Sequence, residues 1–359
     1  MNLRVGIVGF GCMGGTHYNC WRALPGVKVT AVCDIDERAF AALRPKGNIG
    51  TMAGVVEIEG VRLFRSLDSM LEADVVDAVS IATPSDTHAA LACTALRAGV
   101  HVLCEKPMSL DVASCNEMIK AASAARRVLM VAHCIRFWPE YVVACDLVRG
   151  GRYGTVVAAT FRRMGAKPTW AKDSWFADEK RSGGMLIDLH IHDTDFIRYL
   201  FGMPRAVCVH GASNHVFARY DYGDGPLVTA EASWAMTSCY GFEMSFCITL
   251  ERAVLVYDNR RSPTLTVYPA DGAPFSPPRA KGDGYSSEIA HFAALVKGKR
   301  VTPVVPSEEA RDTVRICLVE KEALKRREKM PLGVATAKKR SAAKPRTEDR
   351  RNRLPQKAT

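Results

Sequence analysis

Long hydrophobic runs are missing from this sequence of 359 residues. No apolar stretch approaches the roughly 18–20 residues that a membrane-spanning helix requires. The first predicted strand begins at Leu3, which leaves no room for a signal peptide before it. Hydrophobic residues form 48% of the chain and charged residues 24%, proportions typical of a globular enzyme. We therefore expect a cytoplasmic protein with no membrane segment.

Clustered metal ligands are also missing. The chain has 12 cysteines, but no two of them form a C-x-x-C pair, and they fall singly on predicted strands and helices. Structural metal sites need ligands at short, defined spacing. We expect reduced cysteines that pack as small hydrophobic residues, and no metal site.

Positive charge is concentrated in one segment. The formal net charge is +11, and residues 334–359 hold nine Lys or Arg against two acidic residues. This tail has almost no large apolar side chains, so we expect a basic, disordered extension. It also lacks the aromatic residues that stack on bases, so we expect no specific nucleic-acid partner.

The first part of the chain alternates between strands and helices. A length of 359 residues suggests about two domains. Apolar strands are predicted at 3–9, 27–33, 75–82, 100–104 and 128–132, with helices at 87–98 and 111–127. This alternation predicts an α/β domain over residues 1–125, a Rossmann doubly wound parallel sheet.

The second part of the chain is richer in strands. Runs with strand character lie at 155–161, 205–210, 216–222, 227–235, 240–250, 253–257 and 264–267, and few helices separate them. Helices are predicted at 141–148, 286–296 and 307–329. We therefore expect a second α/β domain over 126–333, with a large open, mainly antiparallel sheet. Helices or another subunit must cover its second face and edges, which favours a homodimer or homotetramer.

The first predicted strand ends in a glycine-rich turn. The six residues Gly9, Phe10, Gly11, Cys12, Met13 and Gly14 match G-x-G-x-x-G, the pattern of dinucleotide-binding turns. Gly9 permits the turn, Gly11 lets backbone amides approach a pyrophosphate, and Gly14 lets the helix pack closely on the strand. Asp34 ends the second strand, 20 residues beyond Gly14, at the expected place for a carboxylate that binds ribose hydroxyls. Such a carboxylate repels a 2′-phosphate, so we expect NAD, and Arg38 keeps NADP as an alternative.

Polar residues follow the predicted strands at 75–82 and 100–104. Thr83, Pro84 and His88 come after one, and Glu105-Lys106-Pro107 ends the other. The ligand crevice of a doubly wound sheet opens at the carboxyl ends of its strands. Lys106 is therefore either a cation beside the nicotinamide or an ordinary surface lysine.

A third polar group lies on a predicted helix after Gly183 and Gly184. Asp188, His192 and Asp195 fall at i, i+4 and i+7 and share one face of an otherwise apolar helix. Buried acids and imidazoles are costly unless they are paired, hydrogen-bonded or functional. The alternatives are a structural His–Asp network or a metal site, although the sequence nominates no third metal ligand.

Together these motifs resemble the glucose–fructose oxidoreductase / inositol dehydrogenase family, often called Gfo/Idh/MocA, over residues 1–330. The resemblance implies a Rossmann domain, a second domain with an open sheet, dimers or tetramers, and sugars, inositols or their derivatives as substrates. It assigns catalytic roles to Lys106, Asp188 and His192. It implies that the cofactor is bound by Gly9, Phe10, Gly11, Cys12, Met13, Gly14, Asp34, Thr83, Pro84, His88, Glu105 and Lys106, and that the substrate is bound by Arg136 and Trp175, with Phe176 beside them.

The resemblance predicts reversible oxidation of a secondary alcohol. His192 is the expected general base, Lys106 is expected to stabilise alkoxide charge, and Asp188 to orient the pair. Two alternatives are an NAD-dependent glycosidase that oxidises its sugar transiently and a non-catalytic ligand-sensing relative. The basic tail departs from the family pattern.

Overall fold

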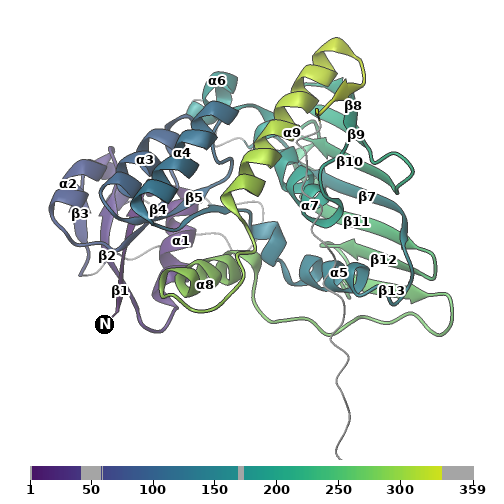
Figure 1. The fold of residues 1–359 in the computed structure, drawn as a ribbon, viewed down its shortest axis with the longest axis horizontal. Helices are drawn as coiled ribbons and strands as arrows, with labels where there is room; N and C mark the ends of the chain where they lie inside the picture. The colour runs from purple at the N-terminus through teal and green to yellow at the C-terminus, as the bar shows by residue number, and fades with distance from the viewer. Residues whose placement is uncertain (1, 42–57, 59, 169–173, 334–359) are drawn as a thin grey trace, which may run out of the picture.

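The computed structural model describes residues 2–41, 58, 60–168 and 174–333 (Figure 1). The predicted basic tail, residues 334–359, lies outside the described residues. In the described part of the chain, no helix combines the length and the apolar character that a membrane crossing requires.

The N-terminal half forms a six-stranded parallel sheet in the order β3-β2-β1-β4-β5-β6. This is the strand order of dinucleotide-binding folds and confirms the predicted fold class. Its strands are β1 (Leu3–Val8), β2 (Val27–Cys33), β3 (Arg62–Phe64), β4 (Ala78–Ile81), β5 (His101–Glu105) and β6 (Leu129–Ala132). The apolar runs become the central strands because helices bury both faces of the sheet.

The helices of this half are α1 (Cys12–Arg22), α2 (Leu67–Glu72), α3 (His88–Arg97) and α4 (Val112–Ala125). Side chains fix the starts of two of them, since Ser66 caps α2 and Asp111 caps α4 by accepting a backbone N–H. The short β3 and α2 were not predicted, because their sequence carries neither a long apolar run nor a complete helical stripe.

The C-terminal half forms an eight-stranded sheet in the order β13-β12-β11-β7-β10-β9-β8-β14. Its strands are β7 (Val156–Met164), β8 (Ala206–Ala212), β9 (His215–Asp221), β10 (Leu227–Ser233), β11 (Glu243–Leu250), β12 (Ala253–Asp258), β13 (Leu265–Pro269) and β14 (Met330–Pro331). The expected antiparallel pairing holds except between β7 and β10, which are parallel. Helices and the β8–β9 hairpin separate these two strands in the chain, so β10 returns in the same direction as β7.

Helices lie on one side of this sheet (Figure 1). They are α5 (Pro139–Arg149), α7 (Ile191–Phe201) and α9 (Ser307–Arg326), whereas α6 (Glu179–Ser182) and α8 (Gly284–Val296) lie beside the N-terminal half. On the opposite face Phe217, Leu227 and Tyr268 are 43%, 55% and 43% exposed. The sheet thus has the open face on which the oligomer prediction rests, and the oligomeric state stays a prediction.

The two halves do not divide at residue 125. β6 completes the parallel sheet although it follows that boundary. α8 also packs on the N-terminal half, where Ile289 and Phe292 join its core and the Phe292 ring meets Trp21 edge to face at 6.0 Å. The chain therefore crosses back from the second half to the first, which anchors one half on the other.

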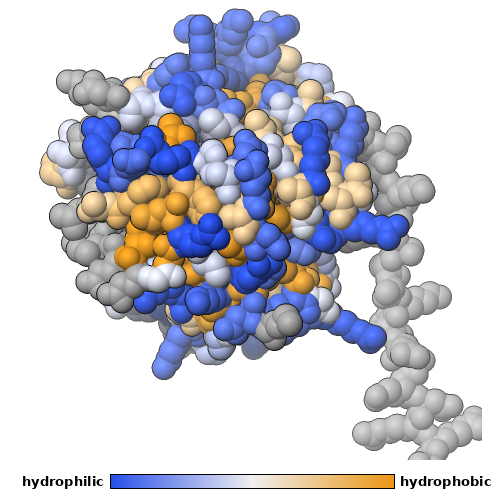
Figure 2. Space-filling view, turned by 90° about the vertical axis from the view of Figure 1, so that its left-hand side faces the viewer, coloured by the Kyte–Doolittle hydropathy of each residue, from blue (hydrophilic) through white to orange (hydrophobic). Residues whose placement is uncertain are grey.

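Figure 2 views the molecule from the side of β3 and α2. Apolar surface lies there among hydrophilic side chains. Ile35, just after β2, is 81% exposed, and Leu63 in β3 is 50% exposed. Ile35 borders the cleft described in the next subsection.

The glycine turn between β1 and α1 leaves little room for side chains. Gly9 has φ +83°, a conformation that favours glycine. A Cβ atom on Gly14 would lie 2.0 Å from the Gly9 carbonyl oxygen, so α1 packs on the strand only without a side chain there. A Cβ on Gly11 would meet nothing within 4 Å and would point into open space.

Replacing each glycine by alanine separates these two roles. Gly14→Ala forces α1 away from β1 and should lower the free energy of unfolding by about 1–3 kcal/mol. Gly11→Ala should leave the melting temperature unchanged and weaken binding of the expected dinucleotide at least tenfold, because its methyl group fills the open space. Thermal unfolding and titration with NAD measure the two effects, and equal affinity of wild type and Gly11→Ala would contradict the assignment.

A buried ion-pair network joins the two halves behind the cleft. Arg136, in the turn after β6, donates to Asp195 of α7 at 2.7 and 2.8 Å and to Glu309 of α9 at 2.6 Å. Thr313 also donates to Asp195. The Arg136 guanidinium has no exposed surface, and it is not among the described residues that line the cleft. The prediction that Arg136 binds the substrate is therefore wrong, because its guanidinium is ion-paired with Asp195 and Glu309.

Removing this cation should mainly affect folding. Arg136→Met leaves Asp195 buried without its strongest partner and should cost about 3–5 kcal/mol of stability. Denaturant unfolding measures the loss, and Arg38→Met, whose exposed pair with Asp36 lies in solvent, is the control and should unfold like wild type. A stable Arg136→Met protein with a raised KM would instead restore the substrate-binding role.

Candidate active site

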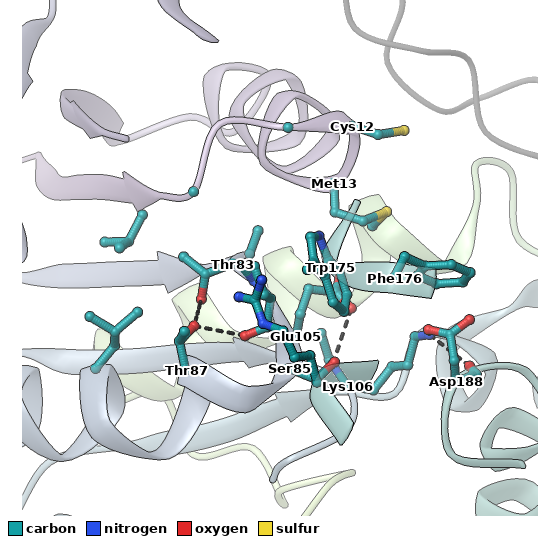
Figure 3. A pocket seen from close by; sticks show the side chains of 18 of the residues that line it. Cys12, Met13, Thr83, Ser85, Thr87, Glu105, Lys106, Trp175, Phe176 and Asp188 are labelled. Atoms are coloured by element: carbon teal, nitrogen blue, oxygen red, sulfur yellow. Dashed lines mark hydrogen bonds and ion pairs between the residues drawn. The ribbon is translucent and has the colours of Figure 1, made fainter. Parts of the chain in front are cut away.

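A cleft of about 840 Å³ opens at the carboxyl edge of the parallel sheet (Figure 3). One arm runs along the glycine turn and the end of β2. The other runs past the end of β5 to α7 and the eight-stranded sheet. The cleft therefore brings together side chains that the sequence places in separate motifs.

The first arm fits a dinucleotide. Gly9, Gly11, Cys12, Met13, Asp34, Thr83 and Pro84 line it, as predicted. No side chain caps α1 at Gly11 and its first turn holds no acidic residue, so backbone N–H groups and the open space beside Gly11 are available for a pyrophosphate. Phe10 and Gly14 do not line the cleft: Phe10 is buried, and Gly14 permits the packing of α1.

Asp34 is held in place at the end of β2. One carboxylate oxygen accepts the Phe10 N–H at 2.7 Å, and the other accepts the Asp36 N–H at 2.9 Å. Arg38, the residue that kept NADP as an alternative, donates instead to Asp36 at 2.8–3.1 Å. Asp34 therefore lines the cleft, whereas Arg38 is paired with Asp36 and is not among the described residues that line it.

His88 supports the cleft without lining it. Its ring is buried, and its two nitrogens lie 2.7 Å from the Pro107 carbonyl oxygen and 3.0 Å from the Thr83 carbonyl oxygen. His88 therefore links the turn after β4 to the turn after β5. The prediction that His88 contacts the cofactor is therefore wrong. Its side chain instead positions the two turns that border the cleft.

Glu105 lines the cleft with a carboxylate held by two donors. His17 lies 2.9 Å from one oxygen, and the Lys106 N–H donates to the other at 3.1 Å. Burial acts to raise the pKa of Glu105, but the hydrogen bond and charge of His17 and the charge of Lys106 outweigh it and leave the pKa lowered. Glu105 is therefore a carboxylate at the base of the cleft.

Glu288 of α8 completes this buried group. A carboxylate oxygen of Glu288, a ring nitrogen of His17 and a carboxylate oxygen of Glu105 lie within 4.8 Å of one another, and neither Glu288 oxygen has a hydrogen-bond partner among the described residues. Burial, and then the charge of Glu105, raises the pKa of Glu288 well above its usual value. Burial thus favours the protonated form of Glu288 beside the Glu105 carboxylate. The sequence pattern did not single out His17 or Glu288.

Lys106 and Asp188 meet across the cleft (Figure 3). The Lys106 ammonium donates to the Asp188 carboxylate at 2.9 Å and to its backbone carbonyl at 2.7 Å, across 82 residues of sequence. Asp188 lies in a π-helical turn, Leu186–His190, that leads into α7. Gly183 begins this region with φ +82°, and a Cβ there would lie 2.7 Å from Ile187. The structure thus joins two of the three predicted catalytic residues directly.

His192 lines the same end of the cleft, one turn after Asp188. Its Nδ1 is buried and has no hydrogen-bond partner among the described residues. Burial, followed by the positive charges of Lys106 and Arg163, lowers its pKa well below the usual 6.5. His192 is therefore neutral at physiological pH. Asp195, predicted on the same face, lies instead in the Arg136 network.

Arg163 is a buried cation that the sequence analysis did not single out. It comes from β7 and donates to both carboxylate oxygens of Asp193, each at 2.9 Å. Its side chain is 2% exposed but borders the cleft. Asp193 follows His192 directly, so this ion pair fixes the start of α7 beside the eight-stranded sheet.

Aromatic side chains form the far wall. Trp175, predicted to lie there, and Phe176 belong to a short helical turn, Trp175–Ala177, and both line the cleft. The wall also holds Trp234, Phe242 and Tyr285. These three were missed, because each follows or precedes a strand or lies on a closing helix, with no local pattern to mark it.

Two family models match the chain. Residues 3–133 match an oxidoreductase family with an NAD-binding Rossmann fold, and residues 141–256 match the GFO/IDH/MocA C-terminal domain. The chain is 30% identical over 322 residues to an inositol 2-dehydrogenase of Rhizobium meliloti (strain 1021), covering 84% of this chain and 92% of the relative. It is 33% identical over 237 residues to inositol 2-dehydrogenase 4 of Saccharopolyspora erythraea, covering 64% of each.

Solved structures share the fold. Levoglucosan dehydrogenase, in complex with NADH and levoglucosan, superposes with a TM-score of 0.77 at 21% identity, covering 92% of this chain and all of that one. The fold, the fitting dinucleotide arm and the two matched domains agree. The chain belongs to the GFO/IDH/MocA family of NAD-binding oxidoreductases.

Proposed function

We propose that this protein oxidises, reversibly, a secondary alcohol on a sugar, an inositol or a related polyol, with NAD as the cofactor. The observation that carries the proposal is the meeting of Lys106, Asp188 and His192 at the end of the dinucleotide arm. Relatives named inositol 2-dehydrogenase and D-apiose dehydrogenase support this class of substrate.

The dinucleotide arm holds NAD through separate groups. The amides at the start of α1 and the open space at Gly11 receive the pyrophosphate, and Asp34 receives the adenosine ribose. Thr83, Pro84 and Glu105 border the path toward Lys106. The nicotinamide, when bound, accepts a hydride from the alcohol carbon or returns it.

His192 takes the hydroxyl proton. A general base must be unprotonated, and burial together with the charges of Lys106 and Arg163 keeps the imidazole neutral. In the reverse direction the protonated ring is a strong acid, because the same environment disfavours its charge. His192 therefore gives the proton back to the carbonyl oxygen.

Lys106 stabilises the alkoxide charge that develops as the proton leaves. Its two bonds to Asp188 fix the ammonium in the cleft before substrate arrives, so little reorganisation is needed. Asp188 orients Lys106.

A ligand-sensing protein needs no such proton-transfer set, which favours an enzyme. Cytoplasmic location and a homodimer or homotetramer stay predictions from the sequence.

Removing the ammonium tests the proposal. Lys106→Met should lower kcat for alcohol oxidation by about 10²–10³-fold, because the oxyanion loses its stabilising charge, with NAD affinity unchanged. Absorbance of NADH, with a panel of inositols, aldoses and uronates, measures the rate. Lys120→Met, an exposed lysine paired with Glu117, is the matched control and should retain full activity. Equal turnover of wild type and Lys106→Met would refute the role.

The pH profile tests the base. Because burial and nearby charges lower the pKa of His192, oxidation by the wild type should lose rate only below about pH 6.5. In Lys106→Met one of those charges is gone, so the pKa of His192 rises and the acidic limb of the residual kcat/KM moves to higher pH. An acidic limb that stays in place, or moves to lower pH, would contradict the assignment of His192.

A further inference from the structure

We propose that the substrate is a glycoside, a sugar ring that carries an apolar aglycone, rather than a free polyol. The inference rests on the proposed dehydrogenase function and concerns the far wall of its cleft. Sugar hydroxyls meet Lys106, Asp188 and His192, and the aglycone lies on the aromatic side chains opposite them.

The aromatic wall is assembled from separate parts of the chain. Its members come from the turn before α6, the end of β10, the start of β11 and α8: Trp175, Phe176, Trp234, Phe242 and Tyr285. Three of the rings are contiguous, since the Phe176 ring lies 5.6 Å from that of Trp175 and 5.1 Å from that of Trp234. In Figure 3 Trp175 and Phe176 lie on the cleft beside Lys106 and Asp188. Such convergence gives a broad apolar surface next to the reacting groups.

Backbone contacts fix two members of this wall, Trp234 and Phe242. The Trp234 N–H donates to Asn214 at 2.8 Å, and its carbonyl accepts the Lys167 N–H at 3.0 Å. Phe242 lies over Gly165, where a Cβ would come within 3.3 Å of the ring. A preorganised aromatic surface binds an apolar group at little entropic cost.

Cations on this side of the cleft are already engaged. Arg163 is bonded through two nitrogens to Asp193, and Arg181, which also lines the cleft, is bonded to Asp86 at 2.8 Å. Among the described residues of the second half that line the cleft, the remaining polar side chains are Asp188, His192 and Tyr285. A free inositol has a hydroxyl on every ring carbon, and those placed against the aromatic wall lose their hydrogen bonds to water without replacement.

The oxidation of such a glycoside balances with the cofactor alone. A ring hydroxyl gives its proton to His192. The carbon that bears this hydroxyl gives its hydrogen, with the electron pair, to NAD as a hydride. The carbon becomes a ketone, NAD becomes NADH, and the glycosidic bond to the aglycone is kept.

Matched sugars test the inference. The full-length protein with NAD is assayed by NADH absorbance on free, methyl and phenyl pyranosides of gluco, galacto, manno and xylo configuration, and on myo-inositol. At least one phenyl glycoside should have a kcat/KM at least tenfold above its methyl and free counterparts. A free sugar or myo-inositol oxidised as efficiently as every phenyl glycoside overturns the inference but leaves the proposed function intact. If no compound yields NADH, although NAD binds, both fail.

Substitutions in the aromatic wall test its role through the ratio of kcat/KM for two substrates assayed with the same preparation. In Trp234→Ala the ratio of kcat/KM for the phenyl over the methyl glycoside should fall at least tenfold, and Trp234→Phe should restore most of it. Because both substrates are assayed on the same preparation, a partly unfolded fraction cancels from the ratio. Phe275→Ala, an aromatic residue 39% exposed beside β13, should keep the wild-type ratio. An unchanged ratio in Trp234→Ala overturns the assignment of the wall.

Discussion

The ion pair between Lys106 and Asp188 is the contact on which the cleft depends. It joins the end of β5 to the π-helical turn before α7, and thereby brings the dinucleotide arm against the second sheet. A lysine at the end of a parallel strand otherwise extends into solvent. Here the Lys106 ammonium donates hydrogen bonds to the backbone carbonyl and the carboxylate of Asp188. These bonds hold the cation between the two halves.

Two further buried cations near the cleft are also paired with carboxylates. Arg136 and Arg163 are both buried, and each is neutralised by a carboxylate of α7, Asp195 or Asp193. Buried charges are tolerated when they are paired in this way. The pairs also hold α7 between the two halves, which keeps the His192 ring in an apolar setting and its pKa low. Stability and proton affinity thus arise from the same packing.

Local patterns predicted the parts of the site that obey a fixed spacing. The glycine turn, Asp34 and the Glu105-Lys106-Pro107 turn each follow a strand, and Asp188 and His192 are one helical turn apart, so short-range geometry predicts their place. Arg136 and His88 carry the same kinds of signal but bond to groups inside the protein. The sequence does not distinguish a polar side chain that lines a cleft from one that forms hydrogen bonds with a residue distant in the chain.

The sequence by itself determined the fold class, the dinucleotide turn and the three polar residues that line the cleft, Lys106, Asp188 and His192, because these follow from hydrophobic periodicity and from short spacings. Only the tertiary structure decided which neighbours those residues have. It buried Arg136 in an ion-pair network, placed Glu288 beside Glu105 in the interior, and gathered aromatic rings from four segments into the cleft that Lys106 also lines. Such contacts join residues far apart in the chain, where the energy of packing and desolvation, rather than local periodicity, selects the partners.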